Sequence, residues 1–231
     1  MGISLKINPV ELYHLLNRGV EKRNIFMSDD DRVRFVHSLY EFNSTHPANN
    51  TRWNLTHSLP AQNNDLRGRY SGRLVDIHGW CLMDNHYHLL VSGRAEKGLS
   101  KFIMKLNVGY AKYFNEKYKR SGALFQGRTK KVLVQRDSHF QYILHYIHLN
   151  PLDFSKESSS WREGVLRSAN AAIQHLEKYR WSSYVDYCGR RNFPSILTKQ
   201  LFSEADGDYE KVLKKYLHDL QADPATNPNL E

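Results

Sequence analysis

Two histidines separated by one residue are the sharpest chemical feature of this 231-residue chain: His86 and His88 flank Tyr87. On a β-strand the side chains of residues i and i+2 point to the same face, so both imidazoles can converge on one ion while Tyr87 faces the other way. This is metal-ligand geometry. Two histidines on a half-exposed strand show the same spacing without any ligand, so the pair alone is weak support for a metal site.

A second group lies in residues 142–150, where polar side chains recur at helical spacing. Tyr146 and Asn150 are four residues apart, so a phenol and a carboxamide project from one helix face, and Tyr142 belongs to the same stripe. Taken alone, the simpler interpretation is that the tyrosines are core aromatics and that Asn150 is a C-terminal cap before Pro151.

The positive charge of the chain is concentrated in one segment. The chain has 33 Lys and Arg against 24 Asp and Glu, and residues 101–136 hold ten of the basic residues against the single acid Glu116. Tyr118 and Phe125 are interleaved with these cations, a combination that suits single-stranded or distorted nucleic acid. A solvated helix face would be the plainer explanation. The basic residues, however, continue past the expected helix end without compensating acids.

The elements that must position these groups follow from periodicity and turn residues. We expect strands over residues 11–18, 73–81, 86–91 and 131–135, and helices after Ser28, from Gly98 to about Ser121, and over residues 139–149, 167–179 and 204–220. The order up to residue 149 is β, α, β, β, α, β, α, as in a ferredoxin-like split βαβ fold. The expected class is therefore α+β, an antiparallel sheet with helices on one face, plus a C-terminal helical extension.

Three separated motifs resemble the single-tyrosine HUH transposases, the IS200-like group, in residues 83–91, 125–128 and 146–151. The closest likeness is to the REP-associated tyrosine transposases, and it runs in order over residues 13–187, most of the chain. The Trp-Ser-Ser-Tyr of residues 181–184 is also similar to the C-terminal part of that family. Three motifs at matching positions are far more specific than any one of them.

This resemblance implies a ferredoxin-like core in which two histidines and a polar helix residue bind a divalent metal. Carried onto this chain, the ligands of Mg²⁺ or Mn²⁺ are His86, His88 and Asn150. The nucleophile is Tyr146, with Tyr142 as second choice. The implied reaction is cleavage and rejoining of single-stranded DNA through a 5′-phosphotyrosine intermediate, at hairpin-forming repeat sequences.

The implied partner is single-stranded or hairpin DNA bound along the basic segment. A free phenol is mostly protonated at neutral pH, so the metal or a nearby base must favour the phenolate. His145 and His148 are possible bases, with little to choose between them. The residues that we expect to contact DNA are Lys105, Lys112, Lys119, Arg120, Gln126, Arg128, Lys130 and Lys131.

We expect the catalytic domain to span residues 8–151, with a mainly helical extension over residues 152–220 and a disordered tail over residues 221–231. Residues 43–71 are rich in Asn, Thr, Ser, Pro and Gly without a sustained period, which predicts a long loop. The sequence gives no role for that loop, and it leaves open whether the protein is a monomer or a homodimer.

Composition excludes several classes of protein. No apolar run approaches the roughly 20 residues that span a bilayer, and the first residues form no export signal, so we expect a cytoplasmic protein that is nucleoid-associated when bound to DNA. Cys81 and Cys188 are too few for a disulfide framework or a structural zinc site.

Two rival functions remain. A domesticated relative would bind structured DNA or RNA without cutting it, although the presence of all four expected site residues argues mildly against this. A metal-dependent hydrolase would use the His-x-His pair without covalent catalysis, but further His and Asp ligands in convincing positions are lacking.

Overall fold

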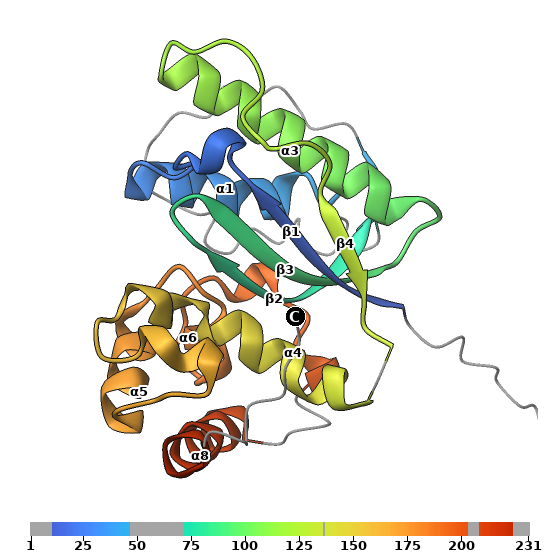
Figure 1. The fold of residues 1–231 in the computed structure, drawn as a ribbon. Helices are drawn as coiled ribbons and strands as arrows, with labels where there is room; N and C mark the ends of the chain where they lie inside the picture. Colours follow the sequence, from blue (N-terminus) through green and yellow to red (C-terminus); the bar gives the residue numbers. More distant parts are fainter. Residues whose placement is uncertain (1–10, 47–71, 136, 203–207, 224–231) are drawn as a thin grey trace, which may run out of the picture.

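The computed structural model describes residues 11–46, 72–135, 137–202 and 208–223 (Figure 1). The strands are β1 Leu12–Arg18, β2 Val75–Leu82, β3 His86–Gly93 and β4 Lys130–Leu133. The α-helices are α1 Asp29–Glu41, α3 Gly98–Lys117, α4 Asp137–Leu149, α5 Ala169–Lys178, α6 Tyr184–Tyr187 and α8 Tyr209–Ala222. Short 3₁₀ helices lie at η1 Val20–Lys22, η2 Asn150–Phe154, η3 Ser159–Glu163 and η4 Pro194–Ile196. The expected βαββαβα order is confirmed.

The four strands form one sheet in the order β2-β3-β1-β4, and each neighbouring pair is antiparallel. β2 and β3 are the predicted hairpin, and β1 lies between β3 and β4. This strand order is that of the ferredoxin-like split βαβ fold, so the predicted α+β class is confirmed.

Helices α1 and α3 cover one face of the sheet (Figure 1). The Phe35 ring of α1 packs between Tyr87 of β3 and Tyr110 of α3, with ring centroids 4.9 Å apart in both pairs. Ser28 caps α1 as expected, and Asp31 completes a capping box by accepting from the Ser28 backbone N–H. Phe35, Tyr87 and Tyr110 belong to the first of two hydrophobic clusters.

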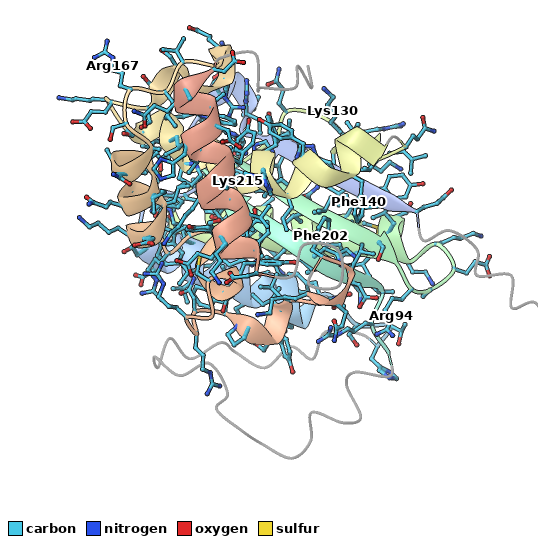
Figure 2. The ribbon with its side chains drawn as sticks, turned by 90° about the horizontal axis from the view of Figure 1, so that it is seen from below. Arg94, Lys130, Phe140, Arg167, Phe202 and Lys215 are labelled. Carbon is cyan, nitrogen blue, oxygen red and sulfur yellow. The ribbon has the colours of Figure 1, made fainter. Side chains whose placement is uncertain are left out.

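Helices also cover the opposite face of the sheet, which corrects the expectation that helices pack on one face. Leu90 of β3 packs in a second cluster with Leu144 of α4 and with Leu213 and Leu217 of α8. Seen from that side, α4 and α8 lie in front of the strands, and Phe140 of α4 stacks on Phe202 with ring centroids 4.9 Å apart (Figure 2). The extension therefore contributes to the same core as α4.

Gly79 lets α4 approach the sheet closely. A Cβ atom at this position of β2 would lie 2.6 Å from Cδ1 of Leu144, which is closer than carbon atoms can pack. Because glycine has no Cβ atom, the helix that carries Tyr146 can pack close to β2, the strand that pairs with the histidine-bearing β3.

Two of the expected segments lie partly outside the described residues. The last helix reaches Ala222, so it takes up the first two residues of the predicted tail, and residues 224–231 lie outside the described residues. The predicted loop over residues 43–71 is described up to His46, and residues 47–71 lie outside. None of the helices in the described ranges is long and apolar enough to cross a membrane.

Candidate active site

Strand alternation places the two histidines of β3 on the face covered by α4. Their ring centroids are 4.9 Å apart. Tyr87 points to the other face, where it is buried and donates its hydroxyl to Asn107 Oδ1 at 2.8 Å. The predicted orientation of all three side chains is confirmed.

His88 is held by a third histidine that stands on the neighbouring strand. His14 of β1 places Nε2 2.9 Å from His88 Nδ1, and the two rings stack with centroids 5.1 Å apart. His88 is 3% exposed, and its Nε2 has no hydrogen-bond partner among the described residues. Burial, followed by the neighbouring imidazoles and arginines, holds the pKa of His88 well below its usual range.

His86 is oriented by the turn that precedes it. Its Nδ1 lies 2.6 Å from Asn85 Oδ1, which leaves Nε2 as the acceptor of a neutral ring. Burial, together with the charges of Arg18 and Arg162, lowers the pKa of His86 to about 4. Both imidazoles are therefore neutral at physiological pH, the state in which a histidine binds a metal.

Helix α4 brings Tyr146 to this histidine cluster. The half-buried phenol ring lies edge-on to His88, with centroids 5.9 Å apart, and edge-on to His14 at 5.8 Å. Trp161 of η3 closes the other side at 5.9 Å. The predicted nucleophile thus lies beside the predicted metal-ligating pair.

Asn150 lies just past α4, at the first residue of η2, and is fully buried. Its Nδ2 donates to the Tyr146 carbonyl at 2.8 Å, so the side chain caps the helix end. Its Oδ1 accepts from Nη2 of Arg162 at 2.7 Å. A carbonyl oxygen has two lone pairs, so Oδ1 can still accept one further partner.

Arg162 links the predicted nucleophile to Asn150. Its guanidinium carbon lies 5.2 Å from the centre of the Tyr146 ring and 4.4 Å from that of Trp161. It pairs with Asp153 at 2.9 Å. Burial would lower the pKa of Arg162, but Asp153 and the Tyr146 phenol outweigh that effect and raise it. A permanent cation therefore sits beside the phenol.

The three residues named as further possibilities point into the packing against α8. Tyr142 lies 5.6 Å from Tyr216, and burial raises its pKa far above the usual range. His145 packs against Tyr209 and Tyr216, and burial lowers its pKa to about 4. His148 is fully buried and uses both ring nitrogens, at 2.7 Å from Tyr209 Oη and 2.7 Å from Ser183 Oγ.

A comparison with protein families finds a match that includes these residues. Residues 66–150 match the family model described as "Transposase IS200 like". This segment of the chain is therefore similar to the IS200-like transposases. The matched segment contains the histidine pair, Tyr146 and Asn150, and the resemblance seen in the sequence is confirmed over this segment.

A solved structure of a REP-associated tyrosine transposase bound to a REP hairpin is also similar to this chain. The two are 10% identical, the match covers 82% of this chain and 85% of the other, and the TM-score is 0.46. No curated protein matches the chain.

The donor atoms of the candidate site fit a divalent metal in part. The unpartnered, buried Nε2 of His88 and the acceptor Nε2 of His86 are suitable ligands, and each Nδ1 is oriented by a hydrogen bond, as is usual for metal-bound histidines. Asn150 can add one oxygen lone pair while it keeps Arg162. Within the described ranges, no three His, Cys, Asp or Glu side chains are grouped as a metal site.

The residues expected to contact DNA are spread over both sides of the sheet. Lys130 pairs with Leu16, which in turn pairs with His88, so Lys130 lies in the same cross-strand row and on the same face as the histidine. Lys131 points to the opposite face. Helix α3, with Lys105 and Lys112, also lies over that opposite face (Figure 1).

Most of the residues expected to contact DNA are exposed. The exposed residues are Lys112, Lys119, Gln126, Arg128, Lys130 and Lys131. Lys105 is half-buried and donates to the Ser44 and His46 carbonyls at 2.6 and 2.8 Å. Arg120 is half-buried and donates to Asn115 Oδ1 at 2.7 Å. The exposed side chains are therefore accessible from solvent.

Two residues of the site were missed by sequence reasoning. His14 is identified by the β1–β3 register, which a single strand does not reveal. Arg162 follows a Ser-rich stretch that shows no helical or strand periodicity. The 3₁₀ helix η3 brings its side chain into contact with Tyr146 of α4. The available signal in the sequence was the Trp161-Arg162 pair, in which Arg162 follows Asp153 by nine residues.

Proposed function

We propose that the protein is a metal-dependent single-stranded DNA endonuclease and strand transferase that works through a 5′-phosphotyrosine intermediate at Tyr146. The observation that carries this proposal is the placement of the Tyr146 phenol, 5.9 Å between ring centroids, beside the neutral imidazole of His88. The match of residues 66–150 to the IS200-like transposases supports it. Preference for hairpin-forming repeats follows from the resemblance to REP-associated tyrosine transposases.

In the proposed reaction the Tyr146 oxygen attacks the scissile phosphorus. The new bond joins this oxygen to phosphorus, the bond from phosphorus to the 3′ oxygen breaks, and the products are a 5′-phosphotyrosine and a free 3′-OH. The phenol loses its proton, and the departing 3′ oxygen takes one up. Reversal of the same step by another 3′-OH rejoins the strands, because the phosphodiester energy is kept in the covalent intermediate.

Arg162 stabilises the negative charge in this step. Its guanidinium lies over the Tyr146 ring and hydrogen bonds to Asn150 and Asp153, so it stays in place as charge develops on the phenol oxygen. A cation fixed before the reaction begins stabilises such charge without reorganisation.

His86, His88 and Asn150 are the residues that would hold the metal. When bound there, Mg²⁺ or Mn²⁺ would polarise the scissile phosphate and neutralise part of its charge. His14 keeps the His88 ring turned so that Nε2 is available, and Asn85 does the same for His86. Lys130 lies in the same row as His88 and would contact a phosphate of the bound strand.

A covalent-adduct assay tests this function. The protein is incubated with labelled single-stranded DNA that contains a hairpin and with Mn²⁺, then denatured and separated by electrophoresis. We expect a labelled band at the mass of protein plus DNA, which is absent in Tyr146→Phe and kept in Tyr142→Phe. Cleavage without an adduct would support a hydrolase instead, and binding without either would support a non-catalytic module.

A further inference from the structure

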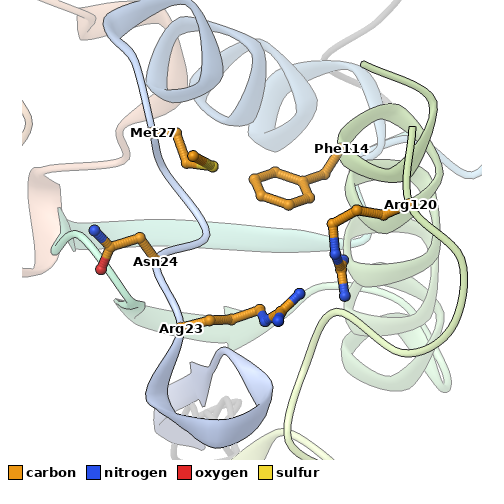
Figure 3. A pocket seen from close by; sticks show the side chains of 5 residues that line it. All are labelled: Arg23, Asn24, Met27, Phe114 and Arg120. Carbon is orange, nitrogen blue, oxygen red and sulfur yellow. The ribbon is translucent and has the colours of Figure 1, made fainter. Parts of the chain in front are cut away.

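A pocket lies on the α3 side of the sheet (Figure 3). It has a volume of about 330 Å³ and is lined by Arg23, Asn24, Met27, Phe114 and Arg120. The first three come from the segment between η1 and α1, and the last two come from the end of α3 and the turn after it. A pocket of this size can hold one nucleotide base.

Two guanidinium groups face this pocket, and none of the residues that line it is acidic. Figure 3 shows the side chains of Arg23 and Arg120 pointing toward each other across it. The buried Nε of Arg23 has no hydrogen-bond partner among the described residues, and in the same ranges neither arginine takes part in an ion pair. Two like charges that converge in this way are stabilised by an anion between them.

Apart from Asn24, the rest of the lining is apolar. Met27 is 62% exposed, an unusual position for a large hydrophobic side chain. Arg120 lies over the Phe114 ring, with its guanidinium carbon 5.7 Å from the ring centre. A flat, aromatic ligand with a phosphate matches these walls, because bases stack on arginine planes and on apolar side chains.

Hydrogen bonds within the protein fix both walls of the pocket. Ile25 and Phe26 are buried, and both donate backbone N–H groups to the Asp84 carbonyl, at 2.9 and 3.0 Å. Arg120 is fixed to Asn115 through side chain and backbone, at 2.7 and 2.8 Å. Both walls therefore keep their positions without a ligand.

The pocket is also at the same end of the sheet as the active site. Arg18 pairs with His86, and Gly19, the next residue, donates its N–H to the Asn85 carbonyl at 2.8 Å. The chain then runs directly through η1 to Arg23. One DNA strand that passes around this end of the sheet can reach both Arg23 and Tyr146.

We propose that this pocket binds one unstacked nucleotide of the DNA substrate, with its phosphate between Arg23 and Arg120 and its base against Met27. The proposal rests on the proposed function for its ligand. In this proposal the pocket recognises a base away from the scissile phosphate. Binding of that base would set the register in which the strand enters the active site.

Binding measurements on the Tyr146→Phe protein test the pocket without cleavage. The affinity for a labelled hairpin oligonucleotide with single-stranded flanks is measured by fluorescence anisotropy, with one abasic nucleotide placed at each flank position in turn. We expect one position to weaken binding about tenfold, the size of one lost stacking contact. In Arg23→Ala/Arg120→Ala the same abasic substitution should have no further effect.

Two further variants control for folding and for general loss of charge. Met27→Ala keeps both arginines and should reduce the effect of that abasic position, while Arg94→Ala removes an exposed arginine after the opposite end of β3 and should leave the whole scan unchanged. Thermal unfolding by circular dichroism checks that each variant is folded.

Three results would overturn the proposal. One is a flat abasic scan, and another is a scan that keeps its sensitive position in the double arginine variant. The third is binding of thymidine 5′-monophosphate that depends on Arg23 and Arg120 while the oligonucleotide affinity does not. Because adduct formation is measured separately with wild-type Tyr146, failure of the pocket and failure of the proposed reaction give different results.

Discussion

At the scale of single residues, Arg162 offers the sharpest test of the active site. Its guanidinium contacts the Tyr146 ring and Asn150 at once. We expect Arg162→Ala to lower the single-turnover rate of DNA cleavage by about 100-fold, the usual cost of removing one fixed donor to developing charge. Arg162→Lys should keep part of the rate, because it keeps the charge but not the planar guanidinium.

A chemical-rescue experiment separates this role from simple packing. Guanidinium chloride at low millimolar concentration should restore part of the rate of Arg162→Ala and leave its DNA affinity unchanged. Arg180→Ala is the matched control, because Arg180 also stacks on an aromatic ring, Trp181, at 4.9 Å. An equal loss of rate in both variants, with no rescue in either, would contradict a role for Arg162 beside Tyr146.

Sequence patterns predicted those site residues whose spacing reflects one local element. The i, i+2 spacing of His86 and His88 put both on one strand face, and the structure confirms it. Asn150 shows the limit of such patterns, because its oxygen meets Arg162, a residue that reaches it by a fold of the extension. His14 required the strand register, which is set by packing of the whole sheet.

At the scale of elements, Asp31 joins α1 to α3. Its buried carboxylate accepts from Lys117 at 2.7 Å, from Tyr118 at 2.7 Å and from the Met27 backbone at 2.8 Å. We expect Asp31→Asn to lower the free energy of unfolding by about 2 kcal/mol, because it removes the charge from three donors and leaves Lys117 unpaired. Urea unfolding at pH 7 measures this. Asp29→Asn, on the exposed start of the same helix, should cost less than about 0.5 kcal/mol.

The same carboxylate predicts a pH dependence of stability. Burial acts to raise the pKa of Asp31, but the hydrogen bonds from Lys117, Tyr118 and Met27 outweigh it and lower the pKa. A lowered pKa in the folded state stabilises the protein above the ordinary pKa of about 4, and this stabilisation is lost as pH falls through the lowered value. The difference in unfolding free energy between wild type and Asp31→Asn should therefore shrink below about pH 4; a constant difference down to pH 2 would contradict it.

Most elements could be predicted because their signals are local. The Ser28 cap, the hairpin turn and the apolar stripe of α3 each lie within one segment, and each forms the element expected. Which face of the sheet a later helix covers is not a local property. The extension after residue 151 shows little helical periodicity. No local pattern therefore predicted that it packs over the second face of the sheet or that α4 contacts it.

At the scale of the whole molecule, the sheet lies between two helical layers, and the second layer is shared by the predicted catalytic domain and the predicted extension. Ile143 and Ile147 of α4 pack in one cluster with Leu213 and Leu217 of α8. Because Tyr146 is on α4, the extension supports the helix that carries the proposed nucleophile. The two parts should therefore unfold together.

Leu213→Ala tests this coupling. Leu213 is fully buried, so its truncation should cost about 2–5 kcal/mol, which lowers Tm by roughly 5–15 °C for a chain of this size. We expect one cooperative transition by circular dichroism, with loss of adduct-forming activity at the same temperature. Val212→Ala, on the exposed side of the same helix, should shift Tm by less than about 2 °C. If α8 instead melts in a separate, earlier transition while Tyr146 still forms its adduct, the extension is an independent unit and α4 does not depend on it.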